Sequence, residues 1–127
     1  MGIRTELALR LPNSPGALAT VSRTLADERV NIIAVSLDVS GQLHLIVDSV
    51  GRATAALRAR HMQVVERDVL VVSPSHSAGG LAPLLALLAD AGVNVDYVYG
   101  GSVEGSASAV VVIGVADPMR AAAATGL

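Results

Sequence analysis

Cysteine is absent from this sequence of 127 residues, and so are phenylalanine, tryptophan and lysine. The lack of cysteine excludes disulfide bonds, thiol catalysis and thiolate metal ligands. All nine basic residues are arginines, spread singly among 11 acidic residues, and the formal net charge is −2. Nucleic-acid binding depends on clustered positive charge, so we expect none here.

Long hydrophobic runs are also missing, although 52% of the residues are hydrophobic and the mean hydropathy is +0.57. The longest uncharged strand-like run, from Ala107 to Ala116, is far shorter than the roughly 20 residues of a membrane-spanning helix. Arg4 and Glu6 leave no room for a signal-peptide core at the N-terminus. We therefore expect a cytoplasmic protein without a membrane segment, with its apolar surface buried in a sheet, an internal interface or an oligomer.

Residues that could support catalysis or bind a metal are not grouped. His44, His61 and His76 lie far apart, without the spacing of metal ligands. No serine has the His–carboxylate pattern of a nucleophilic site, and the acidic residues form no general acid–base pair. The pairs Gly79-Gly80 and Gly100-Gly101 match no phosphate-binding loop, and the second pair is typical of a bulge or bend. We expect no enzyme activity, no metal and no cofactor.

The first half of the chain has the pattern of a βαββαβ unit. Polar and apolar residues alternate up to Arg10, as in a half-buried strand. A helix then follows, with Ser14 as its N-cap, Pro15 at its first position, and Leu18, Val21 and Leu25 on its apolar face. Together the patterns predict strands over residues 4–10, 30–39, 43–50 and 62–73, helices beginning at Pro15 and Ala53, and a tight turn at residues 40–42.

The second half repeats the first. Gly79 corresponds to Gly16 at a constant offset of 63, and Asn94 follows Leu81 at the same spacing at which Asn31 follows Leu18. The helical apolar positions agree at the same offset, which indicates an internal repeat. Further on the offset becomes 68, so the second hairpin has five additional residues, around residues 100–105.

The repeat predicts two modules, residues 1–66 and 67–127, without a flexible linker. A shared strand over about residues 62–73 connects them, either continuous or broken at residues 66–68. The fold class is α+β, with helices on one face of an antiparallel sheet. The second module ends after its second helix and lacks a fourth strand of its own. Because a short sheet edge favours pairing with another chain, we expect a homodimer.

RNA-recognition modules have the same βαββαβ order as this chain, which raises the possibility that it binds RNA. RNA-recognition modules need aromatic residues on the sheet, and this chain has only Tyr97 and Tyr99. The two tyrosines are two residues apart, so in a strand both side chains lie on the same face. Such a pair is more typical of packing than of ligand stacking.

The turn between the first strand and the first helix has two interpretations. A helix N-terminus offers unpaired N–H groups to a carboxylate, and Gly16 allows close approach of a ligand to the backbone. Asn13 and Asn31 can both donate and accept hydrogen bonds, which suits a zwitterion. Alternatively, Pro15-Gly16 forms an ordinary turn and the polar side chains only satisfy backbone groups.

A family resemblance favours the ligand site. The segment Asn13-Ser14-Pro15-Gly16-Ala17-Leu18, followed after the helix by Asn31-Ile32, resembles the signature of the ACT domain, a ferredoxin-like module that binds amino acids and related effectors. Asn13 replaces the usual Asp of the pattern, and Arg29 stands at its usual Gly. Residues 64–70 and 92–99 extend the resemblance to short free-standing tandem ACT proteins.

The resemblance implies a ligand site between modules, where the turn of one faces the start of the second strand of another. The first turn would face Asn94 and Val95, and Asn31 and Ile32 would face the second turn at residues 76–81. His76 stands at the position of Asn13, with a ligand contact and a plain surface role both open. Pro83 predicts that the following helix either starts late or lacks one backbone hydrogen bond. The expected ligand-binding residues are Asn13, Ser14, Pro15, Gly16, Ala17, Leu18, Asn31, Ile32, His76, Ser77, Gly79, Gly80, Leu81, Asn94 and Val95.

The function implied by the resemblance is that of an amino-acid-binding sensor or regulatory protein that is not an enzyme. Its partners would be a small amino acid effector and a second copy of the chain. The alternative is a regulatory subunit that docks on a separate biosynthetic enzyme, as small subunits of acetohydroxyacid synthase do. Neither the effector nor the regulated pathway is specified by the motif.

Overall fold

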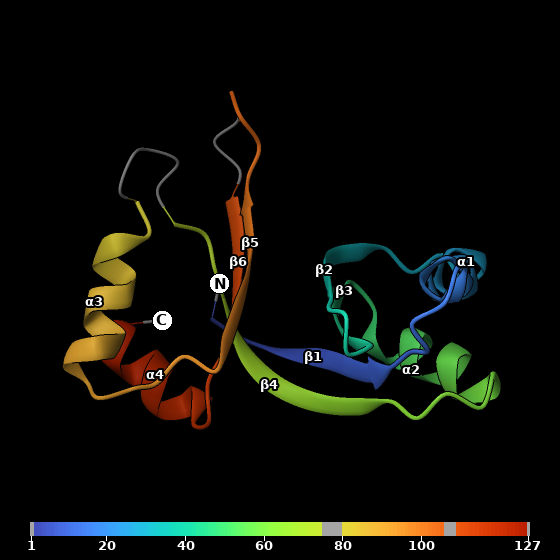
Figure 1. Ribbon diagram of the computed structural model, residues 1–127. Helices are drawn as coiled ribbons and strands as arrows, with labels where there is room; N and C mark the ends of the chain where they lie inside the picture. The colour runs from blue at the N-terminus through green and yellow to red at the C-terminus, as the bar shows by residue number, and fades with distance from the viewer. Residues whose placement is uncertain (1, 75–79, 106–108, 127) are drawn as a thin grey trace. The chain divides into compact units, whose positions relative to one another are not determined.

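The computed structural model describes residues 2–74, 80–105 and 109–126, and its contacts divide the chain into two compact units. The N-terminal unit comprises Thr5–Arg67, and the C-terminal unit combines Met1–Arg4 with Asp68–Leu127. The elements, shown in Figure 1, follow in the order β1 (Gly2–Arg10), α1 (Ala17–Asp27), β2 (Ile32–Leu37), β3 (Gln42–Val47), α2 (Val50–Ala59), β4 (Val65–Val72), α3 (Ala82–Asp90), β5 (Tyr97–Ser102), β6 (Ala109–Gly114) and α4 (Pro118–Thr125).

In the N-terminal unit, α1 and α2 cover one face of strands arranged in the order β2-β3-β1-β4. Strand β3 pairs antiparallel with both β1 and β2. Alternate residues of β1 and β3 point towards the helices, as the period-2 pattern predicted. The buried core of this unit consists of Leu7, Leu9, Leu11, Val21, Leu25, Val30, Leu43, Leu45, Val47, Ala53, Leu57 and Val64.

The C-terminal unit has the same organisation, with α3 and α4 on one face of β4, β6 and β5 (Figure 1). Strand β6 pairs antiparallel with both β4 and β5. Its core consists of Leu70, Val72, Leu88, Val111, Ile113, Val115, Ala121 and Ala122. The α+β class with a repeated ferredoxin-like arrangement is therefore confirmed.

Two strands contribute residues to both units. Strand β4 is continuous over Val65–Val72, so the alternative of a break at residues 66–68 is wrong. No strand follows α4 up to residue 126, which confirms that the second repeat lacks a fourth strand of its own. Strand β1 neighbours β4, and its first residues, Gly2–Arg4, are grouped with the C-terminal unit. They occupy the place of the missing strand there.

The ends of α1 and α3 show the repeat in atomic detail. In α1, the N–H of Val30 donates to the Leu25 carbonyl at 2.9 Å, and in α3 the N–H of Val93 donates to the Leu88 carbonyl at 2.9 Å. The residue before each valine has a positive φ, 56° at Arg29 and 71° at Gly92. This is the Schellman helix end, for which glycine is the usual residue. Arg29 thus adopts the backbone conformation of the glycine that it replaces in the family pattern.

Several predicted details change in the structure. Helix α2 begins at Val50 instead of Ala53, and β4 begins at Val65 instead of residue 62. Gly100 and Gly101 form no bulge, because they pair in regular register with Val111 and Val110. A Cβ at Gly100 would lie 2.2 Å from the Val110 carbonyl oxygen, so glycine allows close strand approach there.

The two tyrosines of β5 pack on each other. Their ring centroids are 6.4 Å apart, and the ring planes differ by 17°. Gly114 leaves room for Tyr97, because a Cβ at Gly114 would lie 2.3 Å from that ring. This agrees with packing, the interpretation that the sequence favoured.

A compact turn joins β2 and β3 and holds the end of β1. The Asp38 carboxylate accepts hydrogen bonds from the Ser40 hydroxyl and from the N–H of Gln42, and these hold the pKa of Asp38 below its ordinary value. The N–H of Leu11 donates to the Gly41 carbonyl at 2.7 Å. The β2–β3 turn therefore positions the segment that leads from β1 into the predicted ligand turn.

Candidate functional site

The predicted ligand turn connects β1 to α1 and lies exposed on the surface. The N–H of Ser14 donates to the Pro12 carbonyl at 2.9 Å, and the N–H of Ala17 donates to the Ser14 carbonyl at 3.4 Å. Gly16 has φ 87° and ψ −9°, a left-handed conformation that glycine adopts without strain. A Cβ at Gly16 would meet no atom within 4 Å, so the space beside its backbone is open.

Helix α1 begins two residues later than the sequence indicated. Its N-cap is Gly16 and its first residue is Ala17, so the expectation that Ser14 caps a helix starting at Pro15 is wrong. The physical reason is the left-handed Gly16, which reverses the chain only after Pro15. Leu18, expected on the apolar face, is 38% exposed, while Val21 and Leu25 are fully buried.

The N-terminus of α1 has the electrostatic character that a carboxylate requires. The first helical bond joins the N–H of Thr20 to the Gly16 carbonyl, so the amides of Leu18 and Ala19 point out of the helix end. The first turn contains no acidic side chain that would neutralise the positive end of the helix dipole. Asn13 and Ser14, which precede these amides by four to six residues in the chain, are both exposed.

Asn31 and Ile32 lie at the other end of α1. Because α1 has 11 residues, it is about 16 Å long, and the turn and Asn31 of this unit do not form one site. The N–H of Asn31 donates to the Asp48 carboxylate at 3.0 Å, and the N–H of Asp48 donates back to the Asn31 carbonyl at 3.1 Å. Asn31 precedes β2, which begins at Ile32 and bulges before Ala34, so its placement inside the strand was wrong.

The second turn is only partly described. His76, Ser77 and Gly79 lie outside the described residues, while Gly80 and Leu81 are half-buried. Helix α3 begins at Ala82 with Pro83 in its first turn, which confirms the late start that Pro83 predicted.

Asn94 and Val95 precede β5 in the C-terminal unit. Val95 packs against the core, and the side-chain amide of Asn94 donates to the Asp96 carboxylate at 3.4 Å. A cavity of about 230 Å³ adjoins Asn94, and the sequence did not indicate the charged residues around it. These charged residues are Asp96, Asp117 and Arg120.

A larger cavity, of about 560 Å³, lies in the N-terminal unit where β1 ends, and it was not predicted. It is formed by three segments that are distant in sequence: the end of β1 with Pro12, the start of β3 at Gln42, and the α2–β4 connection. No local sequence pattern indicated it, because the three segments meet only in the folded chain.

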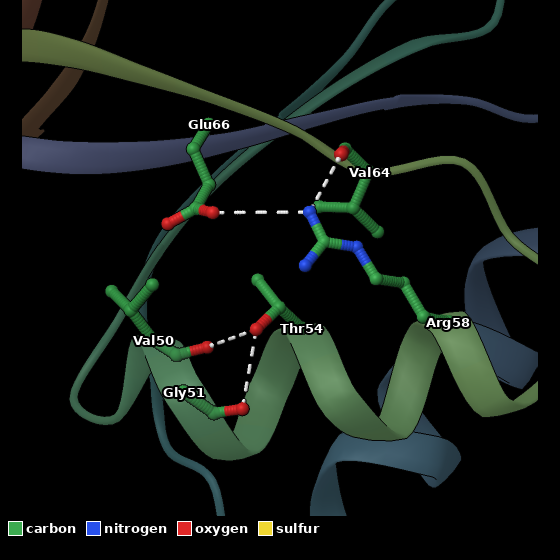
Figure 2. Close-up of polar contacts among 6 residues, drawn as sticks. All are labelled: Val50, Gly51, Thr54, Arg58, Val64 and Glu66. Carbon is green, nitrogen blue, oxygen red and sulfur yellow. Dashed lines mark hydrogen bonds and ion pairs between the residues drawn. The ribbon is translucent and has the colours of Figure 1, made fainter.

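The α2–β4 connection beside this cavity is held by Arg58 of α2. Arg58 donates to the Val64 carbonyl at 3.2 Å and lies 3.8 Å from the Glu66 carboxylate. Figure 2 draws both interactions. In the same view, the Thr54 hydroxyl donates to the carbonyls of Val50 and Gly51, one turn earlier in the helix. The wall of the cavity is thus fixed to the helix that precedes it.

Metal and membrane sites receive no support from the described residues. Within residues 2–74, 80–105 and 109–126, no group of three His, Asp or Glu residues is placed to hold a metal ion. In the same part of the chain, no helix is long and apolar enough to cross a bilayer.

The fold defines a protein built from two ferredoxin-like units. Residues 5–63 match the family model of the ACT domain, so the N-terminal unit is an ACT domain, as its turn motif predicted. The repeated fold extends this architecture to the C-terminal unit.

Solved structures resemble the chain over nearly its whole length. Protein BT0572 from Bacteroides thetaiotaomicron is 29% identical, with a TM-score of 0.88, over 96% of this chain and 85% of that one. The regulatory subunit of aspartate kinase from Thermus thermophilus is 20% identical, with a TM-score of 0.69, over 99% and 93%. The corresponding subunit from Thermus flavus is 18% identical, with a TM-score of 0.66, over 99% and 95%. A search of curated proteins found no match.

Proposed function

We propose that this protein is an amino-acid-sensing regulatory protein and that the turn from Asn13 to Leu18 binds the carboxylate of the effector. The ACT domain at residues 5–63 supports a regulatory role, since ACT domains serve regulation and not catalysis. Further contacts would come from the start of the second strand of another ACT module, Asn31 and Ile32 or Asn94 and Val95. The second turn, which includes His76, Ser77 and Gly79, is proposed as the corresponding site.

The open helix end at Gly16 is the observation that carries this proposal. The left-handed glycine leaves free space next to unpaired amides, and no acidic side chain competes for them. One helix-end interaction contributes only about 0.3–1 kcal/mol. Useful affinity therefore requires that the amides, the Asn13 side chain and a second module act together.

Thermal-shift measurements with each of the twenty amino acids test the proposal. We expect one or a few amino acids to raise the melting temperature, because a ligand that binds only the folded state stabilises it. Asn13→Ala should weaken binding of that amino acid by about tenfold, the loss expected for one hydrogen bond to a charged group.

The matched control is Ser22→Ala, an exposed residue on the same helix, which should bind as the unsubstituted protein does. Equal affinity of Asn13→Ala and Ser22→Ala for the effector would contradict the proposed site.

We further propose that the protein is a homodimer that pairs through β2. In the strand order β2 lies at the end, and Val35 and Leu37 are 48% and 42% exposed on the helix-facing side. The strand has no charged residue that would discourage edge pairing. Sedimentation should show a dimer, and Val35→Arg should shift it to monomer, while Val39→Arg beyond the strand should not. A monomer at every concentration would contradict pairing.

A separate enzyme is the alternative partner, and one surface favours it. Leu85 and Leu87 on α3 are 36% and 45% exposed, although α3 is apolar on all sides. Such a helix normally packs against another element. Stoichiometric recovery of a biosynthetic enzyme with the protein from native lysate would favour a regulatory subunit over a free-standing sensor.

A further inference from the structure

The cavity at the end of β1 has the size and lining of a ligand site distinct from the turn. Its volume of about 560 Å³ is in the range of small-molecule pockets. Its floor is apolar and continuous with the core, because Leu9 and Leu11 are core residues and Met62 packs against them. We propose that this cavity binds a small organic anion with an apolar body, such as a short-chain carboxylate.

The charge of the lining selects an anion. Arg10 lines the cavity, and its Nη1 donates to the Ser40 carbonyl at 2.8 Å, which fixes the guanidinium and leaves its other N–H groups available. In the described part of the chain, no carboxylate lies within 4 Å of Arg10. The lining contains no Asp or Glu, and the nearby Asp38 is engaged by Ser40 and Gln42.

Three further polar side chains in the lining are free to contact a ligand. Among the described residues, the side chains of Gln42, His61 and Gln63 make no hydrogen bond within the protein. Amides donate to carboxylate oxygens, and an imidazole can do so from its N–H. A few polar groups around an apolar floor are typical of sites that orient a small ligand.

Hydrogen bonds within the protein hold both walls of the cavity. On one side, the N–H groups of His61 and Met62 donate to the carbonyls of Arg58 and Leu57, closing the end of α2, and Arg58 holds Val64 (Figure 2). On the other side, the β2–β3 turn holds Arg10 and Leu11. A preformed site loses little conformational entropy on binding.

His61 is unusual at its position. It has φ 62° at a helix end where glycine is the usual residue, and this conformation is strained for a side chain with a Cβ. Arg29 has the same conformation at the end of α1 but lines none of these cavities. Glycine substitutions at His61 and at Arg29 relieve the same backbone strain. Comparing the two variants therefore separates a binding role of His61 from a structural one.

Side-chain amide spectra can report on the cavity and the turn separately. The only glutamines of the chain are Gln42 and Gln63, both in the cavity, and its only asparagines are Asn13, Asn31 and Asn94, all in the proposed effector sites. In a ¹⁵N-edited spectrum of the full chain, hexanoate should shift both glutamine side-chain signals with a Kd on the order of 1 mM. Hexanamide, which has the same shape without the charge, should shift them at least about tenfold less effectively.

Two substitutions complete the test. Arg10→Met keeps an apolar stem and should weaken hexanoate binding about tenfold or more. His61→Gly should weaken binding while the protein melts at the same or a higher temperature, so the loss cannot be due to unfolding. Arg29→Gly should change stability similarly and leave hexanoate binding unchanged.

The proposal is overturned if the glutamine signals stay unshifted at a hexanoate concentration about ten times the expected Kd. Equal binding of hexanoate and hexanamide would overturn it too. Retained hexanoate binding in both Arg10→Met and His61→Gly would overturn it as well. Failure of the turn to bind amino acids would appear in the asparagine signals instead, so the two proposals fail separately.

Discussion

Gly41→Ala is expected to destabilise the protein by on the order of 3 kcal/mol, the largest effect of any glycine substitution in the N-terminal unit. A Cβ at Gly41 would lie 2.1 Å from the Leu11 carbonyl oxygen, and φ at this residue is 89°. The clashing atom belongs to the backbone of a segment that Gly41 itself holds by hydrogen bonding, so it cannot move aside without breaking that bond. Both the strain of the left-handed conformation and the clash must therefore be absorbed.

Gly16→Ala is the matched control for this prediction. Gly16 has nearly the same φ, 87°, but no atom within 4 Å of an added Cβ, so only the conformational strain of about 1 kcal/mol remains. Urea unfolding monitored by circular dichroism measures both variants. Equal losses at Gly41 and Gly16 would show that the contact with Leu11 is absent in solution.

Leu88→Ala is expected to cost about 3 kcal/mol, as is typical for a leucine in a well-packed core. Leu88 is 1% exposed and is the one fully buried residue of α3, all of which the structure describes. Its loss removes the main contact between α3 and the sheet of the C-terminal unit. Since small domains are stable by only about 5–15 kcal/mol, the melting temperature should fall by several degrees.

The neighbouring residue provides the control. Leu87 is 45% exposed on the same helix, and Leu87→Ala should change the free energy of unfolding by less than about 0.5 kcal/mol. Hydrogen exchange of the α3 amides should rise in Leu88→Ala and stay unchanged in Leu87→Ala. A similar loss in both variants would mean that the outer face of α3 is also buried, as it would be against a partner.

Sequence reasoning succeeded where structure depends on residues close in the chain. The constant offset between the repeats predicted that Leu25 and Leu88 occupy equivalent core positions, and both are buried. The ACT resemblance followed from the motif at Asn13–Leu18 and is confirmed over residues 5–63. The placement of Pro83 predicted the late start of α3. Turns and helical periodicity depend on residues that are only a few positions apart, so a single sequence is enough to predict them.

It failed where a local preference has two solutions. Ser14 is a good N-cap residue, yet Gly16 is the N-cap of the helix, because the left-handed glycine lets the chain reverse after Pro15.

The cavity beside Arg10 was not predicted, since its lining joins residues 8–12 with Gln42 and residues 61–65, which are distant in sequence. Only the register of β1 with β3 and the closed end of α2 bring these segments together.

The residue pattern alone established the element types, the duplicated βαββα order, the absent fourth strand of the second repeat and the ACT-type turn. The division at residues 66 and 67 and the ligand residues of the turn remain predictions. The tertiary structure decided the placement of Gly2–Arg4 beside β4, the left-handed backbone of His61 and the cavity beside Arg10. These features depend on pairing between segments that are distant in the chain, as between Arg10 and Gln42, and the energies of such pairing are not expressed in the spacing of neighbouring residues.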